Sequence, residues 1–136
     1  MMKEIKGFTL LELLIALIIV GIISSIAYPS YQESVREAKR SDAIAVMQKM
    51  LASEEKYFID NRVYADDLKD LGLDASTYST DYYDISASQC SSLADLSLCV
   101  ELTALGTGDQ QKDGKIIMNT IGRSVHVDAD GNETQL

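Results

Sequence analysis

The sequence predicts an α+β fold in which one long N-terminal helix packs on a small antiparallel β-sheet. Three observations lead to this prediction. A dense apolar run fills residues 8–28, a one-sided apolar stripe follows it at helical spacing, and four short β-like segments lie in the C-terminal part. A chain of 136 residues has room for one compact domain.

The apolar run from Phe8 to Tyr28 contains 21 residues and a single charged side chain, Glu12. As an α-helix it would span about 31 Å, close to the hydrocarbon thickness of a bilayer. Lys3 and Lys6 precede the run, so the positive-inside rule places the N-terminus in the cytoplasm. We therefore expect one membrane-spanning helix with the rest of the chain outside.

The run does not have the pattern of a secretory signal peptide. Such a peptide is cleaved after its apolar stretch, at small residues, and residues 24–27 imitate that site only weakly. Glu12 also interrupts the stretch near its start, where a carboxylate costs up to about 2.5–3.5 kcal/mol, the value at the bilayer centre. A helix that serves only as a membrane anchor does not require this charge, so we expect Glu12 to have a partner.

Residues 7–13, Gly-Phe-Thr-Leu-Leu-Glu-Leu, resemble the class III signal of type IV pilins and type II secretion pseudopilins. In that family a dedicated peptidase cuts between the Gly and the Phe and methylates the new amine. The resemblance implies a leader over residues 1–7 ending at Gly7, and a methylated mature N-terminus at Phe8. It also leads to the hypothesis that Glu12 pairs with the Phe8 amine of a neighbouring subunit and sets the stagger between subunits.

Pro29 follows the apolar run, and because it removes a backbone donor we expect a helix kink there. Residues 32–61 contain neither Pro nor Gly and carry apolar side chains over an arc of about 160°. This stripe comprises Ile44, Met47, Leu51 and Phe58, flanked by Val46, Met50 and Tyr57. Burial is expected to begin near Ala43. The chain thus divides into the leader, a transmembrane or filament-core helix over residues 8–31, and a globular head over residues 32–136.

Arg36, Lys39 and Arg40 form a basic cluster just beyond the expected bilayer. Three interpretations stay open: anchoring to phospholipid headgroups, pairing inside a filament with the acidic residues at positions 33, 37 and 42, or solvated pairs one helical turn apart. Phe58 and Tyr64 are interpreted as packing residues and not as a platform for a ligand.

In the C-terminal part, residues 66–72 predict one or two helical turns that stop at Gly72, and residues 73–80 predict a loop. Strands are predicted over residues 82–86, 98–105, 115–120 and 123–128. Asp113-Gly114 and Ile121-Gly122 predict tight turns between neighbouring strands. Such short connections favour an antiparallel meander, packed on the amphipathic half of the helix.

The two cysteines, Cys90 and Cys99, favour a disulfide because their number is even and the chain carries an export signal. Closing this loop would contribute roughly 2–3 kcal/mol, and two buried free thiols are the alternative. Many pilins staple their C-terminal loop with a disulfide, whereas this chain has no cysteine after Cys99. A zinc site is not expected, since His126 is the only histidine.

The chain carries 12 basic and 21 acidic residues, a formal net charge of −9. This acidity argues against electrostatic capture of nucleic acid, so no direct nucleic-acid site is expected. The sequence offers no catalytic triad spacing and no phosphate-binding loop, so neither an enzyme nor a cofactor is expected. Residues 128–133 alternate oxygen ligands as a calcium loop does, but they lack the distal Glu of an EF-hand, which favours a polar turn.

Residues 28–32, 54–58 and 68–72 resemble PilE-type minor pilins. The resemblance implies the type IV pilin fold and a structural subunit of a type IV pilus, held in the inner membrane before assembly and extracellular in the filament. The implied partners are other pilin subunits, the prepilin peptidase and methyltransferase, and an inner-membrane assembly platform. The implied roles of the filament are adhesion, twitching motility or DNA uptake. A type II secretion pseudopilin and a membrane-tethered binding module are the alternatives.

Overall fold

The computed structural model describes residues 7–73, 80–93 and 95–136. Most of the predicted leader and of the predicted loop over residues 73–80 lies outside this range. The helix α1 runs from Leu10 to Asn61, and two 3-10 helices follow, η1 (Leu68–Leu71) and η2 (Gly108–Asp113). The strands are β1 (Tyr83–Gln89), β2 (Val100–Gly106), β3 (Lys115–Asn119), β4 (Ser124–Val127) and β5 (Glu133–Gln135). The chain divides into two units, Met1–Glu37 and Ala38–Leu136, with the boundary inside α1.

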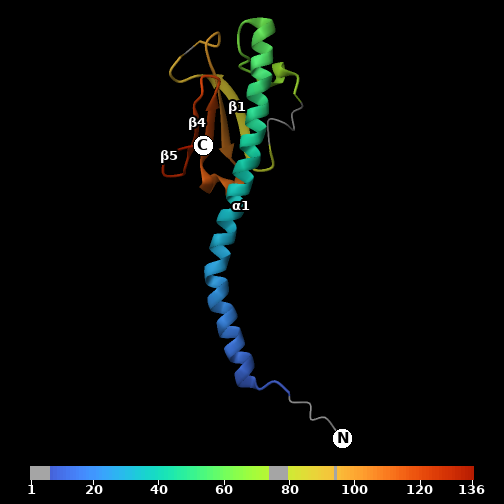
Figure 1. The fold of residues 1–136 in the computed structure, drawn as a ribbon, viewed down its shortest axis with the longest axis vertical. Helices are drawn as coiled ribbons and strands as arrows, with labels where there is room; N and C mark the ends of the chain where they lie inside the picture. The colour runs from blue at the N-terminus through green and yellow to red at the C-terminus, as the bar shows by residue number, and fades with distance from the viewer. Residues whose placement is uncertain (1–6, 74–79, 94) are drawn as a thin grey trace. The chain divides into compact units, whose positions relative to one another are not determined.

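The five strands form one antiparallel meander in the order β1-β2-β3-β4-β5 (Figure 1). The register pairs Tyr83 with Gly106 between β1 and β2, and Val125 with Gln135 between β4 and β5. The α+β class and the four predicted strands are confirmed. Strand β1 extends further than predicted, to Gln89, and β5 was missed because its three exposed residues are too few for an alternating pattern.

The connection between β2 and β3 corrects the prediction of a tight turn at Asp113-Gly114. The chain instead forms η2, and Gly114 ends that helix with φ 90°. A Cβ atom at Gly114 would lie 2.1 Å from the carbonyl oxygen of Val127, so the backbones approach too closely for a side chain. The other predicted turn is confirmed, since the Gly122 N–H donates to the Asn119 carbonyl over 3.3 Å between β3 and β4.

The 3-10 helix η1 ends where the sequence predicted. The side chain of Asp67 caps its start by accepting a hydrogen bond from the Lys69 N–H over 3.0 Å. Gly72 closes it in the left-handed conformation, with φ 67°.

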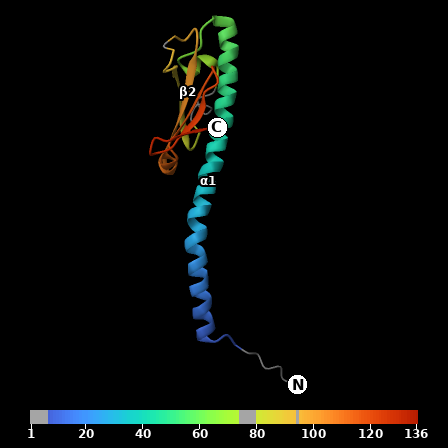
Figure 2. The same ribbon diagram turned by 60° about the vertical axis from the view of Figure 1, so that its left-hand side comes forward.

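The core lies between one face of α1 and one face of the sheet, within the second unit (Figures 1 and 2). The buried positions of α1 are Ala43, Met47, Met50 and Glu54. Burial begins at Ala43 as predicted, but the stripe is centred on Met47 and Met50, with Ile44 and Leu51 only partly buried at its border. From the sheet the core receives Tyr83, Ile85, Leu102, Ala104, Ile116 and Met118. Each large apolar side chain in it contributes about 1.5–3 kcal/mol through burial.

Gly114→Ala should destabilise the second unit far more than Gly131→Ala. Both glycines have nearly the same positive φ, 90° and 88°, so both variants carry backbone strain of about 1–3 kcal/mol. Only Gly114 has a backbone oxygen within 4 Å of its Cβ position, which adds overpacking of about 1–3 kcal/mol. Denaturant unfolding of the full chain in detergent measures the difference. Equal midpoints for the two variants would refute the close approach.

Candidate functional site

Glu12 and Thr9 form a capping box at the start of α1. The Glu12 Oε2 atom accepts hydrogen bonds from the Thr9 N–H over 3.3 Å and from the Thr9 hydroxyl over 3.2 Å. In return the Glu12 N–H donates to the Thr9 Oγ1 atom over 3.2 Å. This reciprocal pattern satisfies helix N–H groups that have no partner within the helix. The sequence predicted Glu12 near the helix start but not its pairing with Thr9, although T-x-x-E is a readable capping signal.

The first half of α1 has no apolar face turned inward. Every residue from 7 to 34 is exposed within the chain, and the large apolar side chains from Phe8 to Tyr31 belong to this surface. By length and composition, α1 is the one helix in the described residues that could cross a membrane. An apolar surface of this extent marks contact with a membrane or with other proteins.

Pro29 lies inside α1, and the α-helix continues through it. The kink expected at this residue stays a prediction. The Ser25 hydroxyl, four residues earlier, donates to the Ile22 carbonyl over 2.7 Å, and the Ser34 hydroxyl donates to the Ser30 carbonyl over 3.2 Å. Serine side chains therefore bond to helix carbonyls on both sides of the proline, a pattern that accompanies bending.

The basic cluster divides into three separate contacts. Arg36 pairs with Glu33 one turn earlier, as one of the three interpretations expected. Lys39 places its ammonium group 3.9 Å from the centroid of the Tyr82 ring, a cation–π contact. Arg40 donates from Nε to an Asp113 carboxylate oxygen over 2.9 Å. Two of these cations, Lys39 and Arg40, thus bind side chains outside α1 in the free subunit.

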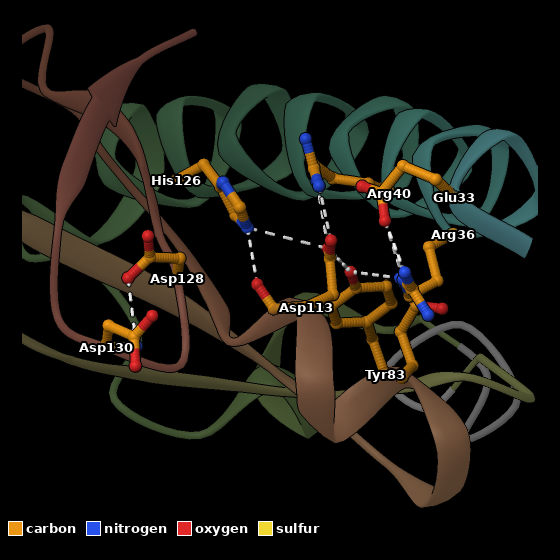
Figure 3. Close-up of polar contacts among 9 residues, drawn as sticks. Glu33, Arg36, Arg40, Tyr83, Asp113, His126, Asp128 and Asp130 are labelled. Carbon is orange, nitrogen blue, oxygen red and sulfur yellow. Dashed lines mark hydrogen bonds and ion pairs between the residues drawn. The ribbon is translucent and has the colours of Figure 1, made fainter. Parts of the chain in front are cut away.

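Asp113 is the centre of a buried polar network (Figure 3). Its carboxylate receives both Arg40 and the Tyr83 hydroxyl, the latter over 2.6 Å. The Tyr83 oxygen in turn accepts a hydrogen bond from Gln110 over 2.9 Å. His126 Nε2 lies 2.6 Å from the Asp113 carbonyl oxygen, so this nitrogen donates. The network joins α1, β1, η2 and β4.

The partners of Asp113 keep it ionised. Burial alone would raise the pKa of its carboxyl, but the hydrogen bonds from Arg40 and Tyr83 and the charge of Arg40 hold that pKa below its ordinary value. The stabilisation is therefore present at neutral pH and is lost as the pH falls through the lowered pKa. Burial and the bond to Asp113 raise the pKa of the Tyr83 hydroxyl, so it stays a donor. The sequence does not predict this network, because its members are far apart in the chain.

Cys90 and Cys99 form the expected disulfide. The loop that they close contacts the segment after α1, since the Tyr64 N–H donates to the Leu96 carbonyl over 2.9 Å. The Tyr64 ring stacks on Phe58 with centroids 4.6 Å apart, which confirms that both are packing residues. The disulfide therefore fixes the loop between β1 and β2 near the end of the helix.

Residues 128–132 form a polar turn. An Asp128 carboxylate oxygen accepts hydrogen bonds from the N–H groups of Asp130 and Asn132 over 3.0 and 2.8 Å. The Asn132 amide donates to the second oxygen over 2.9 Å. Among the described residues no group of three or more acidic, histidine or cysteine side chains is placed to hold a metal. Asp128 organises the turn that leads into β5.

An exposed apolar helix whose start is capped by Thr9 and Glu12, followed by an amphipathic half packed on an antiparallel sheet, is the architecture of a type IV pilin. A family model described as the prokaryotic N-terminal methylation motif matches residues 2–28. The model described as "Type IV minor pilin ComP, DNA uptake sequence receptor" matches residues 29–115, more than half of the chain. The chain belongs to this ComP family of type IV pilins. It is a structural, non-enzymatic subunit, anchored in the membrane as a precursor and extracellular in the pilus.

Individual relatives agree with this assignment. The chain is 33% identical over 72 residues to the type IV major pilin protein PilE of Neisseria gonorrhoeae, a match that spans 53% of this chain and 43% of that one. It is 28% identical to the fimbrial protein EcpC of Eikenella corrodens over 82% of this chain and 74% of that one. A solved type IV pilin from Shewanella oneidensis shares the fold with a TM-score of 0.50 at 17% identity, covering 65% of this chain and 89% of that one.

Tyr83→Phe should destabilise the second unit by about 1–3 kcal/mol, because Asp113 loses a buried donor and Gln110 loses an acceptor. Tyr82→Phe is the matched control, since its ring is 39% exposed and keeps its face under Lys39. Thermal unfolding of the full chain in detergent compares the two variants. A Tyr83→Phe midpoint equal to that of Tyr82→Phe would show that the Asp113 network is not stabilising.

Proposed function

We propose that this chain is a minor subunit of a type IV pilus. The observation that carries the proposal is the match of most of the head, residues 29–115, to a family described as minor pilins. The match of residues 2–28 to the methylation motif supports processing of the N-terminus and assembly through the N-terminal helix. Together they support a subunit that is cut after Gly7, methylated at Phe8 and added to a filament by an inner-membrane platform.

Assembly would provide partners for two features of the free chain, the exposed apolar side chains of residues 8–31 and the carboxylate of Glu12. The exposed apolar side chains of residues 8–31 would be covered by the same segments of other subunits, as they are by lipid before assembly. Glu12 would then lie in a medium where a lone carboxylate is costly, so the mature Phe8 amine of a neighbour is its natural partner. Pairing at one position along the helix would fix the axial offset between subunits.

Among the implied filament activities, DNA uptake is the one that the family description favours, since its members are named DNA uptake sequence receptors. The head of this chain is poorly suited to hold DNA by its own charge. The net charge of the chain is −9, and Arg40 and Arg123 are paired with Asp113 and Glu133. Sequence-independent DNA affinity requires cations that face phosphates. We therefore propose that its contribution to DNA uptake does not rest on attraction of DNA by the net charge of the head.

Glu12→Ala should strongly reduce incorporation into filaments, while Thr9→Val should reduce it little. Each change removes two of the three bonds of the capping box, which costs about 0.5–2 kcal/mol of helix stability, but only the first removes the charge. Immunoblotting of sheared filaments against membrane-retained subunit measures incorporation. Equal losses in the two variants would mean that Glu12 acts as a helix cap and not as a partner of the Phe8 amine.

Deletion of the gene should impair piliation or pilus-dependent DNA uptake and leave type II secretion intact. The two systems use the same N-terminal chemistry, so only the phenotype separates them. Surface filaments by electron microscopy, transformation frequency and an exported enzyme activity are scored in parallel, with complementation as the control. Loss of secretion with filaments intact would make the chain a pseudopilin.

A further inference from the structure

Glu54 is an acidic side chain fully buried in an otherwise apolar stripe. Its relative exposure is 0%, equal to that of Met47 and Met50 on the same face of α1. Acidic residues are almost never fully buried unless they are paired. The location therefore requires an explanation beyond packing.

The hydrogen bonding of Glu54 is incomplete. Its Oε2 atom accepts one bond, from the Ala65 N–H over 2.9 Å, while Oε1 has no hydrogen-bond partner in the described part of the chain. The charged groups that act on it are acidic, Asp66 on the facing segment and Glu55 on its own helix. The pKa of the Tyr64 hydroxyl, which lies on the facing segment, is raised by burial and further by the charges of Glu55 and Glu54. No lysine or arginine forms an ion pair with Glu54 within residues 7–73, 80–93 and 95–136.

The segment that Glu54 holds is a junction between α1 and the disulfide loop. Ala65 is bound by Glu54 itself, and the Tyr64 hydroxyl donates to the neighbouring Glu55 over 3.0 Å. On its other side, Tyr64 donates its N–H to the Leu96 carbonyl, inside the loop that Cys90 and Cys99 close. Release of Ala65 would therefore loosen the contact between helix and loop.

We propose that Glu54 is a proton-dependent latch, which holds the Tyr64–Ala65 segment on α1 as a neutral acid and releases it as a carboxylate. A neutral carboxyl loses little when one of its oxygens is without a partner, whereas a buried anion with a single N–H donor loses most of its hydration. Ionisation also sets a negative charge close to Glu55 and Asp66. Opening of the segment to water relieves both penalties.

The electrostatics of the site agree with this geometry. Burial raises the pKa of Glu54 from 4.5 to about 7, opposed by the bond from Ala65 and reinforced by Asp66 and Glu55. Because the pKa is higher in the closed state than in the open state, the closed state binds the proton more tightly. The stabilisation of the closed state by the neutral Glu54 side chain is complete below about pH 4.5. It is lost as the pH rises toward 7, and it does not return above that value.

Amide exchange at Ala65 tests the latch in the full chain in detergent micelles. The exchange rate of the unmodified chain is divided by that of Glu54→Gln at each pH, so the intrinsic pH dependence of exchange cancels. The ratio should rise between pH 5 and 7, by up to about tenfold per unit, and level off above. The control is Asp60→Asn, which changes an exposed acid on the same helix. The exchange rate of the unmodified chain divided by that of Asp60→Asn should not change with pH. A flat ratio for Glu54→Gln would overturn the latch.

A second measurement uses the unmodified chain alone, so its result does not depend on whether a variant folds. In a carboxyl-carbon NMR titration of the unmodified full chain, the Glu54 resonance should titrate near neutral pH, with the Ala65 amide resonance shifting at the same midpoint. A Glu54 midpoint at the ordinary value of a glutamate, or an Ala65 amide that does not follow it, would refute the proposal.

Discussion

A single constraint governs this chain: one continuous helix serves two environments. The 52-residue α1 is apolar on all sides in its first half and one-sided in its second. Among the residues that the structure describes, only the second half packs on another part of the chain, the sheet of the head. The first half cannot be buried by the chain, so it depends on lipid before assembly and on other subunits afterwards. The proposed cleavage after Gly7, the proposed methylation of Phe8 and the proposed pairing of Glu12 would all serve that dependence.

Polar contacts at both ends of the packed half tie other parts of the head to the helix. Near the start, Lys39 lies over the Tyr82 ring and Arg40 enters the Asp113 network. Near the end, Glu54 binds the Ala65 N–H. The apolar stripe between them supplies most of the free energy, but apolar contacts are not directional. The bonds of Asp113 to Arg40 and Tyr83 therefore position β1 along the helix, while Glu54 positions the segment that follows α1.

The fold was largely predictable, because long periodic segments carry strong signals. The apolar run, the stripe beginning at Ala43 and the four longer strands are local patterns, and the capped helix start is readable from four residues. The Asp113 network was not predictable, since Arg40 and Asp113 are 73 residues apart and neither lies in a local pattern that indicates a contact between them. The burial of Glu54 was not predictable either, since a glutamate is a common residue on an exposed helix surface and no local pattern marks it as buried.

The C-terminal edge of the sheet is held by hydrogen bonds and an ion pair, and not by the disulfide. The covalent link lies instead between the end of β1 and the start of β2, where it fixes a loop beside the helix end. The last strand is held by pairing with β4, by the Leu136 N–H donating to the Ser124 carbonyl over 3.0 Å, and by Arg123 with Glu133. Because the three residues of β5 are exposed, these bonds compete with water and are individually weak. The covalent constraint thus protects the junction of loop and helix, and the terminal strand is the part of the sheet least costly to open.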